Sequence, residues 1–303
     1  MSGVTWALLA GVGFGVFQAV NRRAVVRMDV YVATFLQLLV SAVVLGAASV
    51  TTEDLSQLRA APTIALLNFA LAGFFHFFCG WTFLNASQKR IGAARTGALI
   101  ATVPLFGVVL AALLLQEVPT AIATAGIFLM IGGVYLIHYS QDAFAASAGV
   151  IAQPLPRTRW RPLLWGLAAA FCMSLSPIFI RQGLEGLPSP ILGVTVGVTT
   201  SAVAYGLVLI VRRFYTSLGA VTWDSLGFKL TAGILVGLAT WSRWVALDLA
   251  PVAIVLSLML ISVPITNLIA PLLVERHLER ITARVWFGSL LIAGGALILA
   301  VTR

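Results

Sequence analysis

The chain alternates long apolar runs with short polar or basic segments, and this pattern continues from one end of the sequence to the other. A helix needs about 20 apolar residues to cross a hydrocarbon core about 30 Å thick. Ten runs have approximately this length, and they predict an all-α polytopic membrane protein with ten transmembrane helices. The predicted spans are residues 4–21, 30–49, 63–85, 93–115, 120–138, 163–181, 189–211, 229–247, 252–274 and 283–301.

The overall composition supports this interpretation and excludes a soluble protein. Of the 303 residues, 60% are hydrophobic and 10% are charged, and the mean hydropathy is +1.02. A soluble domain carries about a quarter charged residues, so this chain cannot supply a polar shell. We therefore expect a multi-pass protein of a bacterial plasma (inner) membrane.

Basic residues are distributed unevenly among the connections between the spans. Of the 19 lysines and arginines, 15 fall in the odd-numbered connections. Because Lys and Arg are retained on the cytoplasmic side, we predict that these connections are cytoplasmic and that both termini are external. The net charge of +9 then needs anionic lipid as its partner, and no nucleic acid. The 15 basic residues of the odd-numbered connections are Arg22, Arg23, Arg27, Lys89, Arg90, Arg95, Arg157, Arg159, Arg161, Arg212, Arg213, Lys229, Arg276, Arg280 and Arg284.

The two halves of the sequence repeat one pattern of landmarks. Residues 125–137 align with 287–299, and ATVPLF at 101–106 aligns with ISVPIT at 261–266. Because each half holds five spans, the second copy should enter the membrane in the opposite orientation, as in many secondary carriers. Further matched pairs are Trp6 with Trp165, Arg22 with Arg181, Ala72-Gly73 with Ala232-Gly233, Trp81 with Trp241, and Ala86 with Ala246.

The domain organisation follows from this repeat. We predict a first five-helix repeat over residues 1–141 and a second, inverted one over residues 163–303. Between them, residues 142–162 form the longest connection, which contains Pro154, Pro156 and Pro162. Proline disfavours helix, so we expect this segment to be a cytoplasmic linker.

Several of these landmarks resemble the drug/metabolite transporter superfamily, in its EamA-like ten-helix branch. They are ALDLAPVAIVLSLMLISVPI at 246–265, the proline in the fourth span of each repeat, an acidic residue soon after it (Glu117; Glu275 or Glu279) and the closing glycine pairs. The resemblance implies a transporter. The sequence departs from the family at Gln37, where many members carry Arg, and in the predicted external termini.

Polar and aromatic residues inside the spans are the candidates for substrate contact, since such groups are costly in lipid. His76 either hydrogen-bonds a neighbouring helix, or contacts the substrate or exchanges a proton. Trp81 and Asn85 lie four residues apart on one helix face, and Trp241 and Trp244 lie near the corresponding end of the eighth span. The tryptophans are interpreted either as interfacial anchors or as an aromatic wall of the site.

Arg181 and Arg243 are the sharper candidates, because they lie on the side where positive charge is scarce. They either reach the interface or pair with Glu185 and Asp248, or they bind a carboxylate or phosphate of the substrate. Six further polar residues are weaker candidates, with hydrogen bonding between helices as the alternative. They are Gln18, Asn21, Gln37, Thr102, Ser262 and Asn267.

Small residues and prolines mark candidate packing positions and hinges. GVGFGV at 11–16 has the glycine content of a dinucleotide loop, but it lies inside a span and lacks the G-x-G-x-x-G spacing. Gly11 and Gly15 instead predict close helix packing. Pro104 and Pro264, in the fourth and ninth spans, are the predicted hinges.

These observations predict a secondary transporter that moves a small polar metabolite by alternating access. We expect an amino acid or a similar compound, leaving the cell. No Asp or Glu lies in the middle of a span, which disfavours a cation–proton antiporter of the small multidrug type. The alternatives are an organophosphate or nucleotide-sugar-type carrier and a non-transporting scaffold or signalling protein.

The same sequence disfavours an enzyme. It lacks GxSxG and HExxH motifs and paired carboxylates in the middle of a span. We expect no cofactor and no bound metal, and the sequence carries no signal for an oligomeric state.

Overall fold

The computed structural model describes residues 2–25, 29–91, 93–147, 161–213, 223–273 and 282–301, and within these ranges the chain is helical with short connections. Ten helical segments in the described part are long and apolar enough to cross a membrane, and they confirm the predicted spans to within a few residues at most ends. They are α1 (Gly3–Val25), α2 (Val30–Thr52), α4–η1–α5 (Thr63–Gly73, Phe74–Gly80, Trp81–Ile91), α6–α7 (Ala93–Ile100, Val103–Leu114), α8 (Ala121–Ser147), α9 (Leu163–Gly186), α10 (Pro190–Arg213), α11 (Trp223–Leu249), α12–η2–α13 (Val252–Leu258, Met259–Ile261, Ser262–Leu273) and α14 (Ala283–Val301). A short helix, α3 (Ser56–Ala60), connects α2 to α4.

Several span ends differ from the sequence prediction, and two of these differences change how a segment is interpreted. Helix α8 continues to Ser147, so the first residues of the predicted linker are helical, while residues 148–160 lie outside the described part. The eighth span begins at Leu226, and Lys229 is therefore buried inside the bundle at 2% exposure instead of lying in a basic connection. The apolar residues Leu226 and Phe228 ahead of Lys229 are the sequence signal that extends this span.

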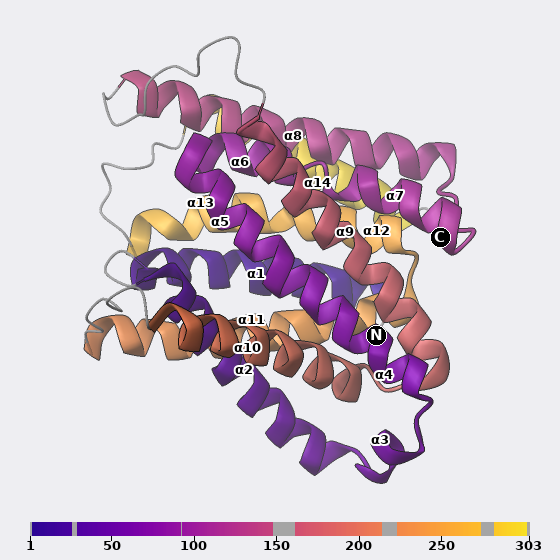
Figure 1. Cartoon of the computed structure of the whole chain (residues 1–303). Coiled ribbons are helices and arrows are strands. Elements are labelled where there is room, and N and C mark those ends of the chain that lie inside the picture. Colours follow the sequence, from indigo (N-terminus) through magenta and orange to yellow (C-terminus); the bar gives the residue numbers. More distant parts are fainter. Residues whose placement is uncertain are drawn as a thin grey trace.

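Helices of the two halves interleave instead of forming two separate bundles (Figure 1). Helix α1 of the first half packs on α11 and α13 of the second half. Correspondingly, α9 of the second half packs on α4, η1, α5 and α7 of the first. These pairs map onto each other under the sequence repeat.

The first helices of the two halves also run in opposite directions through the bundle. Gly3 at the start of α1 lies against Ala250, and Arg181 near the end of α9 hydrogen-bonds the carbonyl of Leu247. We call this end of the bundle the terminal face, since α1 begins there. The opposite directions are consistent with the predicted inverted repeat.

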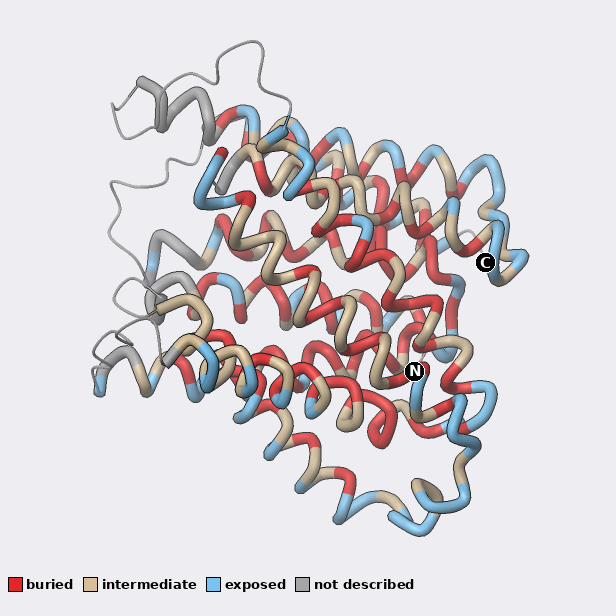
Figure 2. The backbone as a smooth tube through the Cα atoms, viewed as in Figure 1, coloured by how far each residue is buried: buried red, intermediate tan, exposed pale blue. Residues whose placement is uncertain are grey.

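Buried residues gather toward the interior of the bundle (Figure 2), and large apolar residues are also exposed on its outer surface. Leu38, Phe69, Met130 and Trp244 are among the fully buried side chains. Large apolar residues such as Val43 and Leu290 are more than 60% exposed, as expected for helices that face lipid rather than water.

Three of the spans are interrupted near their centres. The third contains the seven-residue π-helical segment η1, the fourth breaks between α6 and α7, and the ninth passes through the 3₁₀ turn η2. Pro104 lies at the start of α7, and Pro264 lies near the start of α13. The two predicted hinge prolines thus follow equivalent breaks, at a position where a helix tolerates proline.

Candidate functional site

His76 and Arg243 meet in the interior of the bundle. The π-helical segment η1 carries His76, and α11 carries Arg243, with exposures of 8% and 1%. Nη1 of Arg243 lies 3.0 Å from Nδ1 and 3.2 Å from Nε2 of the imidazole. Since a guanidinium can only donate, at least one ring nitrogen of His76 accepts. π-Helical segments are frequent at functional sites, and this one carries the histidine.

The rest of the Arg243 guanidinium has no partner. Its Nε and Nη2 atoms are buried and make no hydrogen bond, and no carboxylate pairs with it among the described residues. A buried cation without a counter-charge is costly in a membrane protein. Arg243 is therefore a candidate for binding an anion that the described part of the chain does not supply.

A chain of aromatic rings begins beside His76. Trp81 stacks on Phe17 of α1, with ring centroids 6.2 Å apart, and meets Phe77 edge-on at 5.0 Å. Phe77 in turn contacts the ring of His76 at 4.7 Å. Trp81 thus lies within the bundle, and Asn85 is half-buried one turn further along α5.

The other two predicted tryptophans lie apart from Trp81. Trp244 is 1% exposed and packs against Phe69 at 5.4 Å, where Gly193 and Gly197 leave room for its ring. Trp241 is half-buried and meets Trp6 of α1 edge-on at 5.6 Å. Packing between helices therefore accounts for the position of Trp244.

Arg181 lies at the terminal face. Its Nη2 pairs with Oε1 of Glu117 at 2.9 Å, and its Nη1 donates to the carbonyls of Leu247 and Asp248. The pairing with Glu185 that the sequence suggests is replaced by this longer-range one. The second carboxylate oxygen of Glu117 accepts the backbone N–H of Val252 at 2.8 Å.

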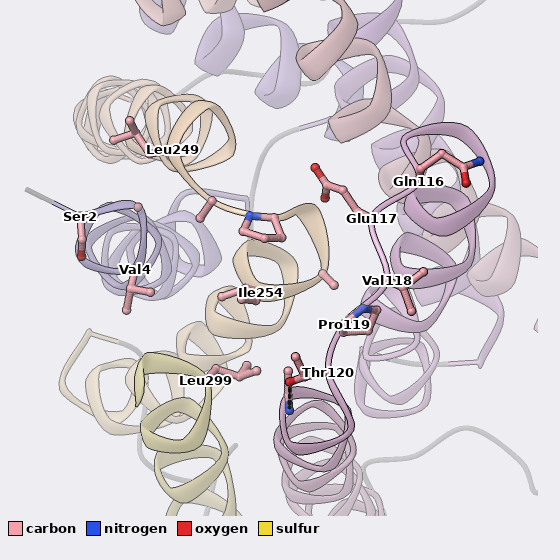
Figure 3. A pocket seen from close by; sticks show the side chains of 15 residues that line it. Ser2, Val4, Gln116, Glu117, Val118, Pro119, Thr120, Leu249, Ile254 and Leu299 are labelled. Atoms are coloured by element: carbon pink, nitrogen blue, oxygen red, sulfur yellow. Dashed lines mark hydrogen bonds between the residues drawn. The ribbon is translucent and has the colours of Figure 1, made fainter. Parts of the chain in front are cut away.

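A cavity of about 700 Å³ opens beside this ion pair (Figure 3). Its wall combines the start of α1, the Gln116–Thr120 connection and the Leu249–Ile254 segment. Glu117 lies on this wall, whereas His76 and Arg243 do not line the cavity.

The remaining predicted residues fall into three places. Gln18 is exposed on α1. Gln37 is 2% exposed and accepts a hydrogen bond from Lys229, a contact that the sequence analysis missed. Gly11 and Gly15 lie against Ile261 and Ile265 of the ninth span, so close that a Cβ at either glycine would overlap them.

Residues 1–139 match the EamA-like transporter family. One solved structure, titled "Crystal structure of protein", shares the fold over 99% of this chain and 98% of its own chain, with a TM-score of 0.77 and 17% sequence identity. No curated protein matched the chain. Over residues 1–139, the chain is therefore similar to the EamA-like transporter family, part of the drug/metabolite transporter superfamily.

Proposed function

We propose that this protein is a secondary carrier that exports small polar metabolites bearing a carboxylate, with amino acids as the first substrates to test. The EamA-like family indicates a membrane transporter of small molecules. The observation that carries the substrate class is Arg243, a fully buried cation whose Nε and Nη2 have no partner.

The orientation of Arg243 suits a carboxylate. Nε and Nη2 form one edge of the guanidinium, with parallel N–H bonds that match the two oxygens of a carboxylate. His76 holds Nη1, the nitrogen outside this edge. The imidazole therefore orients the fork and leaves its bidentate edge for the substrate.

The aromatic residues next to the pair suit the remainder of such a molecule. Phe77 and Trp81 form an apolar wall beside His76. Small-molecule sites are mostly apolar with a few polar groups that fix orientation. Alternating access would expose this position to each side of the membrane in turn.

The test is counterflow, in which proteoliposomes are loaded with an unlabelled amino acid, simple monocarboxylate or phosphate ester, and entry of the same compound in labelled form is measured. We expect exchange of carboxylates, reduced roughly tenfold or more by Arg243→Gln. Arg243→Lys should restore part of it, because Lys keeps the charge and loses the fork. Arg59→Gln, which removes an exposed arginine from α3, is the matched control and should exchange normally.

The outcomes separate the alternatives. Exchange of phosphate esters alone would replace this substrate class with the organophosphate one, and absence of exchange for every class would favour a scaffold. The export direction is tested with right-side-out vesicles, in which loaded substrate should leave faster than external substrate enters under the same gradient.

A further inference from the structure

Lys229 is a second buried cation of α11. The chain has two lysines, Lys89 and Lys229. Lys89 is exposed near the end of α5, whereas Lys229 is 2% exposed inside the bundle. A lysine inside a transmembrane bundle is expensive and marks a functional site by default.

The partners of Lys229 are two neutral side chains. Its Nζ donates to Oδ1 of Asn21 on α1 and, at 3.1 Å, to Oε1 of Gln37 on α2. An ammonium group has three N–H donors, and no carboxylate pairs with Lys229 among the described residues. Nε2 of Gln37 is also buried and makes no hydrogen bond. The cluster therefore has positive charge and a spare amide donor, with no anion to receive them.

Packing alone does not require this cluster. In the sequence repeat, Lys229 corresponds to Phe69, since Ala232-Gly233 corresponds to Ala72-Gly73. Gly73 packs on the backbone of Gly197 in α10, and Gly233 packs on Gln37 and Val40 in α2, so the two halves make equivalent crossings. At the first crossing the apolar Phe69 is fully buried. A crossing of this kind thus accommodates an apolar residue. Packing between the helices therefore does not explain why the second crossing carries a lysine.

Lys229 and Arg243 also share one face of α11. The two residues are 14 positions apart, which is close to four helical turns. Their side chains therefore point in nearly the same direction, about 21 Å apart along the helix. Lys229 lies toward the Trp223 end of α11 and Arg243 toward the terminal face.

We propose that Lys229, Gln37 and Asn21 form a second anion-binding site, which receives the carboxylate of the transported metabolite on the opposite side of Arg243 from the terminal face. The third N–H of Lys229 and the Nε2 amide of Gln37 donate to the carboxylate. The two sites are then successive stations on one path along α11. This inference rests on the carboxylate carrier proposed above for the identity of its ligand.

The test uses acetate as the probe and acetamide as its neutral isostere, with the full chain in nanodiscs. A ligand that binds the folded state raises the thermal midpoint in proportion to its affinity and concentration. We expect acetate, and not acetamide, to stabilise the wild type. Lys229→Met should lower the apparent acetate affinity of this site about tenfold or more. Lys89→Met is the matched control and should leave the titration unchanged.

Gln37→Glu is a second variant that does not depend on losing the lysine. It places a carboxylate beside Lys229, so it should raise the midpoint without ligand and remove the same part of the acetate response. If either folded variant, Lys229→Met or Gln37→Glu, retains the full acetate response, the second site is wrong.

The two proposals fail in different ways. Normal acetate titration in Lys229→Met, together with exchange that depends on Arg243, would remove the second site and keep the carrier. Loss of acetate binding in Lys229→Met, without exchange of any carboxylate in proteoliposomes, would keep the anion site and remove the carrier.

Discussion

At the scale of single residues, the contact between His76 and Arg243 links the two halves of the chain. The two residues are 167 positions apart in sequence. The equivalent positions in the repeat are Val236 and Phe83, which are apolar. The polar pair is therefore present at one of the two related places. In the predicted inverted repeat, this polar pair belongs to one of two corresponding positions.

His76→Leu should destabilise the protein, since Nη1 of the buried Arg243 would lose its acceptor. The expected loss is about 1–3 kcal/mol, measured as a lower thermal midpoint in nanodiscs. His76→Gln keeps an acceptor oxygen and should retain most of the stability. Equal midpoints for the Leu and Gln variants would show that the hydrogen bond contributes nothing.

At the scale of helices, close crossings decide which side chains meet. Gly73 lets α4 touch the backbone of α10 at Gly197, a few residues ahead of His76. A Cβ at Gly73 would overlap the backbone of Gly197, and backbone cannot move aside as a flexible side chain can. The position of η1 therefore depends on a residue that has no chemistry of its own.

Gly73→Ala should cost about 1–3 kcal/mol, the usual penalty for overpacking, even though Ala favours helix. Gly46→Ala on α2 is the matched control, because nothing lies within 4 Å of the added methyl. That change should be neutral or stabilise by up to about 1 kcal/mol. The thermal midpoints of the two variants separate the effect of the helix crossing from that of helix propensity. Equal midpoints would contradict the close contact between Gly73 and Gly197.

The ion pair of Glu117 and Arg181 acts at the same scale, because it joins the connection before α8, the end of α9 and the start of α12. Glu117→Ala removes the pair and the acceptor of the Val252 N–H, and we expect a loss of about 1 kcal/mol in this partly exposed setting. Glu185→Ala removes the same charge from an exposed position on α9 and should have no measurable effect on the thermal midpoint. A larger effect of Glu185→Ala would restore the pairing suggested by the sequence.

At the scale of the whole molecule, interleaving of the halves means that the two buried cations of α11 take their partners from the first half. Arg243 needs His76 from the first half, and Lys229 needs Asn21 and Gln37 from the first half. We expect the two halves to fold as one unit.

The orientation in the membrane is a prediction at this scale. Charge places Asp54, in the connection between α2 and α3, outside the cell. In a chain whose two cysteines, Cys79 and Cys172, are replaced by Ala, Asp54→Cys should react with an impermeant maleimide added to intact cells. Gln88→Cys, exposed near the other end of the third span, should react only after lysis. The reverse pattern would place both termini in the cytoplasm.

The ten spans could be predicted from the sequence, because the length of an apolar run is set by the thickness of the bilayer and does not depend on neighbouring helices. The sequence also identified His76 and Arg243 as polar groups inside spans. Their partners could not be predicted, because a partner depends on how each helix is rotated and on which helices it crosses. In the structure, His76 contacts Arg243, and Arg181 pairs with Glu117 instead of Glu185. Lys229 lies inside the bundle instead of in the predicted connection. These contacts connect residues at least 64 positions apart, a separation over which local hydrophobic pattern carries no information about contact.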